Sequence, residues 1–267
     1  MAAPNLLNSI TDASDTDREC VVVTGSHGGL YAAYLASKAG IRACVFNDAG
    51  RGLDDAGIAG MMALGDVDGQ SGGMAAAAVD CLTARIGDAA DMMAGGLISA
   101  ANGPALALGV TEGMACVNAA ALLENAAAPT GHLPAVEEAR RVIDRPGRPW
   151  VILVDSASLV KPDDAGQIVV TGSHGGLIGG DPARAIKADV LIAVYNDAGG
   201  GKDNAGVARL PALDARGIAG LTVAHTSARI GDARSMWDGG VISHANERAS
   251  GLGAAPGMML KAYLETV

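Results

Sequence analysis

Short apolar runs and stretches of helical character alternate along the first half of the chain. Three runs have the length and residue types of buried strands, and turn residues bound them: Cys20–Thr24, Ile41–Phe46 and Met74–Val79. Runs that are apolar throughout are typical of strands buried on both faces of a parallel sheet. The pattern therefore predicts a mainly parallel sheet.

The stretches between and after these runs carry helix signals. The predicted helices are Leu30–Lys38, Asp54–Leu64, Asp88–Met93 and Thr111–Leu123. The first closes at Gly40, and the second opens with acidic residues, which suit a helix N-terminus. Strands that alternate with helices form βαβ units. We therefore predict an α/β fold.

The chain contains an internal duplication. Each half carries the blocks TGSHGG, NDAG and ARIGDA in the same order, and GGLISAAN from Gly95 returns as GGVISHAN from Gly239. A repeat this long is a duplicated half rather than a solenoid unit of about 20–50 residues. We expect two βαβ-type halves related by a pseudo-twofold axis, by analogy with other duplicated folds.

The repeat also sets the expected domain boundaries. The first half covers residues 1–124, a proline-containing linker covers 125–149, and the second half covers 150–267. We predict one short helix in the linker, around Ala135–Ile143. The first copy carries five more residues than the second between NDAG and ARIGDA, which we place within Gly65–Gly72.

Composition and charge exclude several classes of partner. The chain has 29 acidic and 19 basic side chains, a formal charge of −10, and no basic run. Nucleic-acid binding draws its affinity largely from Lys and Arg on phosphates, and anionic membrane surfaces attract the same residues. We therefore expect neither partner. A small-molecule ligand remains the expected partner.

The segment at the start and the cysteines indicate a cytoplasmic protein. The first residues lack the basic and apolar regions of a secretory signal, and no stretch has the roughly 18 apolar residues of a membrane span. The four cysteines form no CxxC pair, which fits a reducing compartment. Alanine-rich helices and an aromatic content of 3% make a homo-oligomer the expected state.

The TGSHGG block follows the first predicted strand and opens a helix. Backbone amides there, aided by the helix dipole, could hold an anion. The block is neither GxGxxG nor a P-loop, so no nucleotide is predicted. Glycines alone would make a tight turn, but such a turn does not need a histidine. We therefore select as site residues Ser26, His27, Gly28 and Gly29 with their counterparts Ser173, His174, Gly175 and Gly176.

The NDAG block follows the second strand. Asn47 and Asn196 are expected to bond turn amides, the usual role of Asn before such a turn. For Asp48 and Asp197 two roles stay open. Each could bond turn amides, or could orient a histidine or bind a cation from the end of its strand.

The ARIGDA block follows the third strand and supplies one arginine per copy. Arg85 and Arg229 could each hold a substrate carboxylate through a bidentate contact. An internal ion pair with Asp88 or Asp232 is the alternative.

The two copies differ at positions that carry chemistry. Alignment through ARIGDA places Cys81 opposite His225, and Ala100 opposite His244. A pseudo-dyad near these loops would bring Cys81 within reach of His225. An imidazole beside a thiol lowers its pKa and makes a nucleophile. Amides of GSHGG would then stabilise an oxyanion. These residues predict an amidohydrolase-like enzyme that cleaves a C–N bond, amide or imide, of a small anionic metabolite.

Three alternatives remain open. Cys81, His225 and His244 could bind zinc or another divalent metal, although no close ligand spacing supports it and no metal ligand is assigned. A cofactor-independent isomerase or racemase could use His27 and His174, or Cys81 and His225, as acid and base. The third alternative is a non-catalytic small-molecule binding protein or a subunit of a complex. No organic cofactor is expected.

Two polar residues recur in the last repeated block. Ser99 and Ser243 are expected to cap the segment that follows them. Asn102 and Asn246 are assigned as substrate contacts.

Overall fold

The computed structural model describes residues 3–66 and 73–267, and these divide into two compact units. Unit 1 consists of residues 1–51, 55–137 and 201–203, and unit 2 of residues 52–54, 138–200 and 204–267. Each unit therefore includes a three-residue segment from the other repeat. Residues 67–72, where most of the predicted insertion falls, lie outside the described residues.

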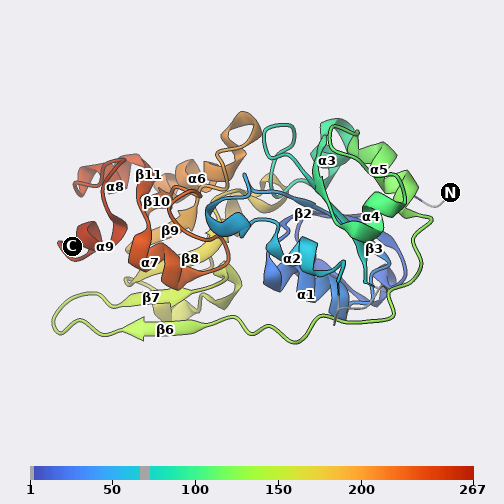
Figure 1. The fold of residues 1–267 in the computed structure, drawn as a ribbon. Coiled ribbons are helices and arrows are strands. Elements are labelled where there is room, and N and C mark those ends of the chain that lie inside the picture. The colour runs from blue at the N-terminus through green and yellow to red at the C-terminus, as the bar shows by residue number, and fades with distance from the viewer. Residues whose placement is uncertain (1–2, 67–72) are drawn as a thin grey trace. The chain divides into compact units, whose positions relative to one another are not determined.

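Unit 1 is built on a five-stranded sheet in the order β1-β2-β3-β4-β5 (Figure 1). The first four strands are parallel, and the last runs antiparallel to β4. The strands are β1 (Asn5–Leu7), β2 (Val21–His27), β3 (Ala43–Asn47), β4 (Ala75–Val79) and β5 (Ile98–Ala101).

Helices cover both faces of this sheet (Figure 1). Side chains alternate between the faces, because a strand has a period of two. Val23 and Val45 pack with the residues of α3 and α5, whereas Val22 and Phe46 pack with α1 and α2. The helices are α1 (Leu30–Lys38), α2 (Ala59–Ala63), α3 (Ala89–Gly95), α4 (Gly103–Ala107) and α5 (Cys116–Leu123), with 3₁₀ turns η1 (Ile10–Asp12), η2 (Asp15–Asp17) and η3 (Leu53–Asp55).

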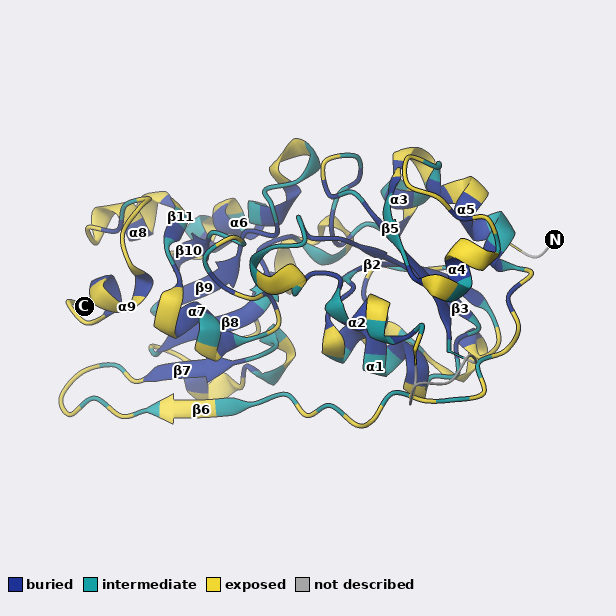
Figure 2. Ribbon diagram, viewed as in Figure 1, coloured by how far each residue is buried: buried dark blue, intermediate teal, exposed yellow. Residues whose placement is uncertain are grey.

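Unit 2 has a six-stranded sheet in the order β11-β10-β9-β8-β7-β6. Its four inner strands are parallel, and both edge strands are antiparallel to their neighbours. The strands are β6 (Arg140–Ile143), β7 (Val151–Val154), β8 (Ile168–His174), β9 (Ile192–Asn196), β10 (Ala219–Val223) and β11 (Ile242–Ala245). Figure 2 shows the inner strands as buried.

Unit 2 lacks a counterpart of α1 among its described residues. Short 3₁₀ turns follow β8 instead, and Arg209 is buried beneath them, in the position that Gly60 has in the first repeat. A Cβ on Gly60 would lie 2.3 Å from the carbonyl oxygen of Gly29, so only glycine allows α1 to pack there. The elements are η4 (Ala157–Leu159), η5 (Pro162–Asp164), η6 (Ile178–Gly180), η7 (Pro182–Arg184), η8 (Lys202–Val207), α6 (Arg209–Ala215), α7 (Ala233–Gly239), α8 (Glu247–Gly251) and α9 (Leu260–Leu264).

The structure confirms the α/β fold and the three strands predicted in the first half, with shifted ends. The predicted helix around Ala135–Ile143 is wrong. Arg140–Ile143 forms strand β6, which pairs with β7 over four residues. Val142 and Ile143 are β-branched, and the adjacent VILV run offers them a strand partner, which explains the outcome. Arg140–Ile143 therefore belongs to the sheet of unit 2.

No helix in residues 3–66 and 73–267 reaches the length and hydrophobicity needed to cross a membrane. Cys20, Cys44, Cys81 and Cys116 are all free thiols.

Candidate functional site

The NDAG turn after β9 is held in a strained conformation. The side chain of Asn196 accepts a hydrogen bond from the amide of Ala198 at 2.9 Å, and Asp197 accepts one from Gly199 at 3.1 Å. Ala198 has φ 49°, a left-handed conformation that is unfavourable for alanine. The same arrangement follows β3, where Ala49 has φ 50°. The turn role predicted for the two asparagines is confirmed.

In unit 2 this turn places a buried carboxylate beside an imidazole. Oδ1 of Asp197 lies 2.9 Å from Nδ1 of His225 and 2.9 Å from its backbone nitrogen. Asp197 is buried, and His225 is half-buried. When Nδ1 donates to the carboxylate, the lone pair of the neutral imidazole is on Nε2. The pair has the geometry of a general acid–base dyad.

Electrostatics favour a charged carboxylate in this dyad. Burial alone would raise the pKa of Asp197, but hydrogen bonds from the side chain and backbone of His225, its charge, and a hydrogen bond from Ser243 bring the pKa below its usual value. Asp197 is thus an anion at neutral pH. It can orient His225 and stabilise its protonated form.

A β-bulge brings Ser243 to the dyad. In the pairing of β10 with β11, Thr222 lies opposite His244 and Val223 opposite Ile242, which leaves Ser243 as the extra residue. A bulge of this kind redirects a side chain at the edge of a sheet. Ser243 contacts Asp197 on one side and Thr222, at 3.0 Å, on the other.

Unit 1 carries the equivalent site with a thiol in place of the imidazole. Oδ1 of Asp48 accepts a hydrogen bond from the backbone amide of Cys81 at 2.9 Å, and Oδ2 accepts one from the hydroxyl of Ser99 at 2.8 Å. Ser99 is the extra residue of the matching bulge between β4 and β5. The two units therefore share one framework and differ at the reactive group.

The environment of Cys81 opposes its ionisation. Burial raises the pKa of the thiol to about 12, and the charges of Asp48 and Asp80 add to this effect. Nucleophilic cysteines usually have a lowered pKa. Cys81 lies in unit 1 and His225 in unit 2. Their predicted pairing stays a prediction.

The histidines of TGSHGG are part of the turns that contain them. Nδ1 of His27 accepts the amide hydrogen of Gly29 at 3.1 Å, and Nδ1 of His174 accepts that of Gly176 at 3.1 Å. Burial lowers the pKa of His27 to about 4. His27 is therefore neutral at pH 7, with its proton on Nε2.

The remaining groups of this block are also engaged within their own unit. The amides of Gly28 and Gly175 donate to the carbonyls at the ends of β3 and β9. The hydroxyls of Ser26 and Ser173 accept from the amides of Ile10 and Ala157. An oxyanion role for these glycine amides would require the hydrogen bonds of the turn to break.

The two arginines of ARIGDA form ion pairs. Arg85 in unit 1 contacts Asp91 at 2.9 Å and Asp203 at 2.7 Å. Arg229 in unit 2 contacts Asp54 at 2.7 Å and, more distantly, Asp232 at 3.6 Å.

Each arginine also pairs with an aspartate from the other repeat. Asp54 and Asp203 occupy the same position of the two repeats, and each belongs to the unit of the arginine that it contacts. Asp88 and Asp232 cap α3 and α7, and Asp232 also lies 3.6 Å from Arg229. The alternative expectation, an internal ion pair for each arginine, is thus seen: Arg229 pairs with the expected Asp232 as well as with Asp54, and Arg85 pairs with Asp91 and Asp203 in place of Asp88.

Asn102 and Asn246 have structural roles. The amide oxygen of Asn102 accepts from the backbone of Ala76 and Ala105, and its nitrogen donates to the carbonyls of Met61 and Met74. Asn246 repeats the pattern in unit 2. These residues cap α4 and α8, the role that the sequence assigned to the serines. Their hydrogen-bonding capacity leaves none for a ligand.

One group of metal-ligating side chains occurs among the described residues. Asp48, Asp80 and Cys81 each place a ligand atom within 4.8 Å of the others. Oδ1 of Asp48 already accepts two amide hydrogens, and Oδ2 accepts a hydroxyl. The group contains no histidine, and its thiol has a raised pKa. It fits a zinc site poorly.

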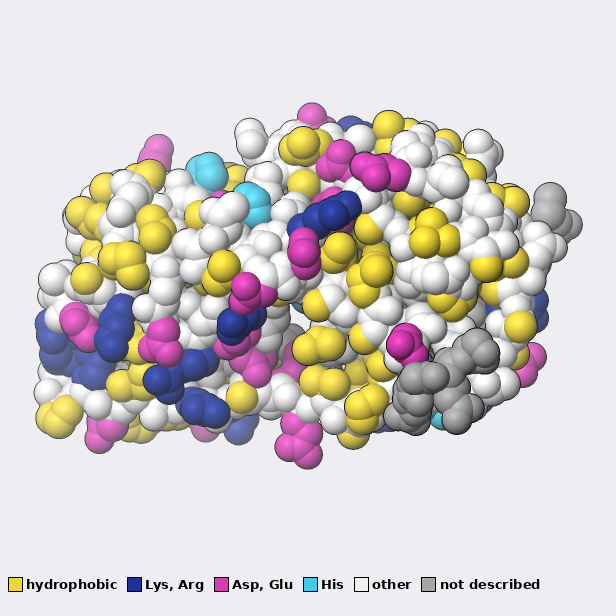
Figure 3. Space-filling model, in the orientation of Figure 1, with side chains coloured by type: hydrophobic (Ala, Val, Ile, Leu, Met, Phe, Trp, Pro, Cys, Tyr) yellow, Lys and Arg dark blue, Asp and Glu magenta, His cyan; other side chains and the backbone are white. Residues whose placement is uncertain are grey.

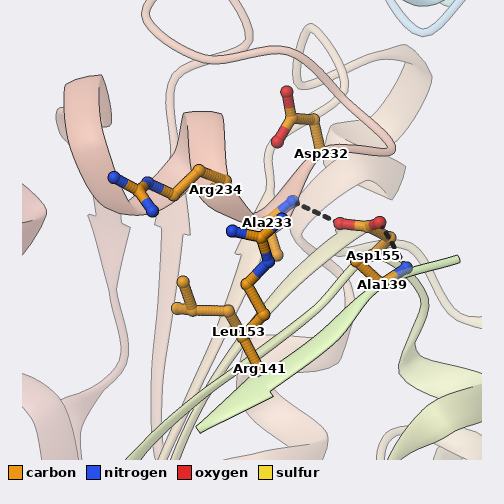
Figure 4. Close-up of a pocket in the computed structure, with 7 residues that line it drawn as sticks. All are labelled: Ala139, Arg141, Leu153, Asp155, Asp232, Ala233 and Arg234. Atoms are coloured by element: carbon orange, nitrogen blue, oxygen red, sulfur yellow. Dashed lines mark hydrogen bonds between the residues drawn. The ribbon is translucent and has the colours of Figure 1, made fainter. Parts of the chain in front are cut away.

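A small pocket in unit 2 lies beside the start of α7 (Figure 4). Asp155 holds its base together by accepting hydrogen bonds from Ala233 at 3.0 Å and Ala139 at 2.7 Å. No predicted site residue lines it. The lining residues are Ala139, Arg141, Leu153, Asp155, Asp232, Ala233 and Arg234.

Sequence reasoning missed Thr222 and Arg209. Thr222 stands where the first repeat has Ala78, so the comparison of copies that selected His225 and His244 also carries the signal for it. Arg209 stands opposite Gly60, an equally visible difference. Histidine side chains reach the molecular surface in Figure 3, and His244 is exposed.

Comparison with models of known protein families, with curated proteins and with solved structures gave no match.

Proposed function

We propose that the protein is an enzyme in which His225, oriented by Asp197, transfers protons at a small polar metabolite. The observation that carries this proposal is the 2.9 Å contact between Nδ1 of His225 and the buried carboxylate of Asp197. Burying a carboxylate costs stability unless the charge is paired and hydrogen-bonded, and His225 supplies such a partner to Asp197. Dyads of this form are the usual general acid–base device of enzymes.

The proposed reaction is hydrolysis of a C–N bond in an amide or imide. Nε2 of His225 takes a proton from water as the water oxygen bonds to the carbonyl carbon. The imidazolium then returns that proton to the leaving nitrogen as the C–N bond breaks. Asp197 stays ionised throughout and stabilises the imidazolium. Cys81 takes no part as a nucleophile in this scheme, because its pKa of about 12 keeps the thiol protonated.

Arg229 is the proposed anchor for an anionic group of the substrate. Its Nε contacts Asp54 at 2.7 Å, and both side chains are half exposed. Exposed ion pairs are weak, so a substrate carboxylate can displace Asp54 from the guanidinium. The amide of Leu53, next to Asp54, donates to the carbonyl of His225 at 2.8 Å. The residue to be displaced therefore follows directly in sequence a residue that is hydrogen-bonded to the backbone of His225.

An isomerase is the second candidate. The observation in its favour is again the contact between Asp197 and His225, which suits proton transfer. Cys81, the thiol selected from the sequence, is held in its neutral form. The same imidazole would remove a proton from carbon and return it to the other side or to a neighbouring atom. Incorporation of solvent deuterium into recovered substrate distinguishes this reaction from hydrolysis.

The cellular setting forms part of the proposal. Four free thiols support a reducing compartment, here the cytoplasm. A homo-oligomer is proposed from the alanine-rich helices, and light scattering on the purified protein tests it.

The test of function is a screen of small amides and imides that carry a carboxylate, with released ammonia or amine as the readout. Turnover that is lost in His225→Gln and retained in Cys81→Ala supports the proposal. Turnover that survives His225→Gln, or that needs Cys81, contradicts it. Saturable binding without turnover of any compound would favour the non-catalytic alternative.

A further inference from the structure

Three polar side chains on β10 and β11 lie next to the dyad and have no part in the reaction proposed above. Oγ1 of Thr222 lies 3.3 Å from Nδ1 of His244 and 3.0 Å from Oγ of Ser243. Oγ of Ser243 lies 3.3 Å from Nδ1 of His244. Each of the three thus contacts the other two. Thr222 is fully buried, and His244 is exposed.

Ser243 connects this group to the dyad. Ser243 also interacts with Asp197 and helps to lower the pKa of that carboxyl, and Asp197 in turn contacts Nδ1 of His225. A continuous series of interacting polar groups therefore runs from the exposed His244 to His225, through the hydroxyl of Ser243 and the carboxylate of Asp197.

The series exists only in the second repeat. Unit 1 keeps the aspartate and the serine, as Asp48 and Ser99, and their hydrogen bond is 2.8 Å long. Ala78 and Ala100, which replace Thr222 and His244, have no polar side chain that could extend it, and Cys81 replaces His225. The histidine of the dyad and the two residues that lead to it differ together between the copies.

We propose that Thr222, Ser243 and His244 form a positioning network through which the protonation of the exposed His244 controls the proton on His225. The inference deepens the proposed function and rests on His225 as its acid–base group. His244 acts through Ser243 and Asp197, and it need not contact the substrate.

The number of hydroxyl hydrogens explains the coupling. Two hydroxyls supply two hydrogens to several acceptors: Asp197, Nδ1 of neutral His244 and the other hydroxyl. Protonated His244 becomes a donor at Nδ1, so the hydroxyl of Ser243 is free to donate to Asp197. That carboxylate then attracts the proton of His225 less strongly. The positive charge of His244 acts in the same direction, and His225 is left as the neutral base.

Other charged groups also lie close to His225 within unit 2. Asp197 contacts the ring, and His244 acts through Ser243. The Gly52–Asp54 segment packs on the backbone of His225 and carries Asp54, which pairs with Arg229. The variants below leave Asp197, Asp54 and Arg229 unchanged, so a change in the titration of His225 reports on the network.

The test is a pH titration of the imidazole nitrogens by NMR on the full chain, which needs no substrate. In the unmodified protein, we expect the His225 signal to respond twice, once with its own ionisation and once with that of His244. His244→Gln removes the second response and raises the midpoint of His225 by about half a pH unit. Ser243→Ala weakens the coupling, because only the through-space effect of the His244 charge remains. Ser99→Ala is the matched control in unit 1 and leaves His225 unchanged.

A His225 titration that is the same in His244→Gln and the unmodified protein overturns the network. If Ser243→Ala fails to fold, Thr222→Val replaces it, because valine keeps the shape of threonine and removes its hydroxyl; it weakens the coupling. Failure of the two proposals is distinguishable. Coupling between His244 and His225 without any enzymatic turnover contradicts the proposed function and supports the network. Turnover that depends on His225, without such coupling, supports the proposed function and contradicts the network.

Discussion

His225 and Cys81 occupy the same position of the two repeats, and each has its backbone amide hydrogen-bonded at 2.9 Å to the aspartate that ends the neighbouring strand. The two side chains then differ: Nδ1 of His225 lies 2.9 Å from Oδ1 of Asp197, whereas a hydrogen bond to Asp48 is one of the causes that raise the pKa of the Cys81 thiol. The duplication has thus produced two copies of one framework with different reactive groups. Unit 2 holds the Asp197–His225 pair, and unit 1 holds a thiol whose pKa is raised.

Replacing the carboxylate of the dyad should change the basicity of its histidine. Asp197→Asn keeps the size of the side chain and removes its charge. We expect the pKa of His225 to fall by about one unit or more, because the imidazolium loses an adjacent anion. NMR titration measures this value. Asp48→Asn makes the same change in unit 1 and serves as the control. A midpoint that does not move would show that Asp197 does not stabilise the charged imidazole.

Cys81 should resist alkylation at neutral pH. Its pKa of about 12, caused first by burial and then by Asp48 and Asp80, leaves almost no thiolate at pH 7.5. Cys20 is half-buried and gives an internal reference for an accessible thiol in the same sample. Mass spectrometry after a timed iodoacetamide reaction should find Cys20 modified and Cys81 intact. Rapid modification of Cys81, with half-maximal rate below the free-thiol value of about 8.5, would restore it as a nucleophile.

The turn histidine of unit 1 should make stability depend on pH. Burial lowers the pKa of His27 from 6.5 to about 4, so between these values the unfolded chain binds a proton that the folded chain does not. The free energy of unfolding is therefore highest above pH 6.5, where His27 is neutral in both states. It falls as the pH drops from 6.5 towards 4, because only the unfolded chain takes up the proton there. The loss amounts to at most about 3 kcal/mol.

His27→Asn isolates this effect. An asparagine oxygen can accept the amide of the second residue on, as Asn47 does here, but it does not titrate. Urea unfolding at pH 7.5 and pH 4.5 gives the loss of stability for each protein. We expect a smaller loss in the variant. Equal losses in the two proteins would mean that His27 is protonated normally in the folded state.

Much of this framework could be predicted from the sequence, and the reasons are physical. The β-branched run at Val21–Val23 has few alternatives to a buried strand. The NDAG asparagines act within two residues of themselves, so local chemistry is enough to assign them. A carboxylate that orients a histidine was one of two roles expected for Asp197. Its partner, His225, lies 28 residues away, and only the folding of the sheet selects it.

Other features depended on packing that a local pattern does not contain. Strands β5 and β11 are short and carry Ala and Ser, so their periodicity is weak, and their bulges cannot be seen without the partner strand. The role of His27 in its turn needs a side-chain direction, which residue type alone does not give. The expectation that a turn has no use for a histidine overlooked that an imidazole nitrogen can accept an amide hydrogen.

One glycine should be indispensable for the dyad. A Cβ on Gly206 would lie 2.0 Å from the carbonyl oxygen of Asp197, a contact that only backbone movement can relieve. We expect Gly206→Ala to destabilise unit 2 by about 3 kcal/mol or more. Hydrogen exchange, read by mass spectrometry, locates the loss in that unit.

Gly251→Ala is the control, since a Cβ at this helical glycine meets no heavy atom within 4 Å. It should stabilise the protein by about 0.4–1 kcal/mol. If Gly206→Ala behaved like Gly251→Ala, the close approach of the two segments at the NDAG turn would be refuted.

Arg209 should be essential to the stability of unit 2, although it has no part in the proposed reaction. The buried guanidinium donates to the carbonyls of Gly176, Arg184 and Ala185 and lies 4.8 Å from the ring centre of Tyr195. These bonds hold the short turns that replace α1. Arg209→Met keeps most of the volume but leaves buried carbonyls without donors, which costs about 3 kcal/mol.

The matched control is Arg248→Met, which changes an exposed arginine of α8 and should alter stability by no more than about 0.5 kcal/mol. Chemical denaturation compares both variants with the unmodified protein. A neutral Arg209→Met would mean that the turns after β8 hold their shape without the guanidinium. In that case the loss of α1 from the second repeat would need a cause other than the exchange of glycine for arginine at this position.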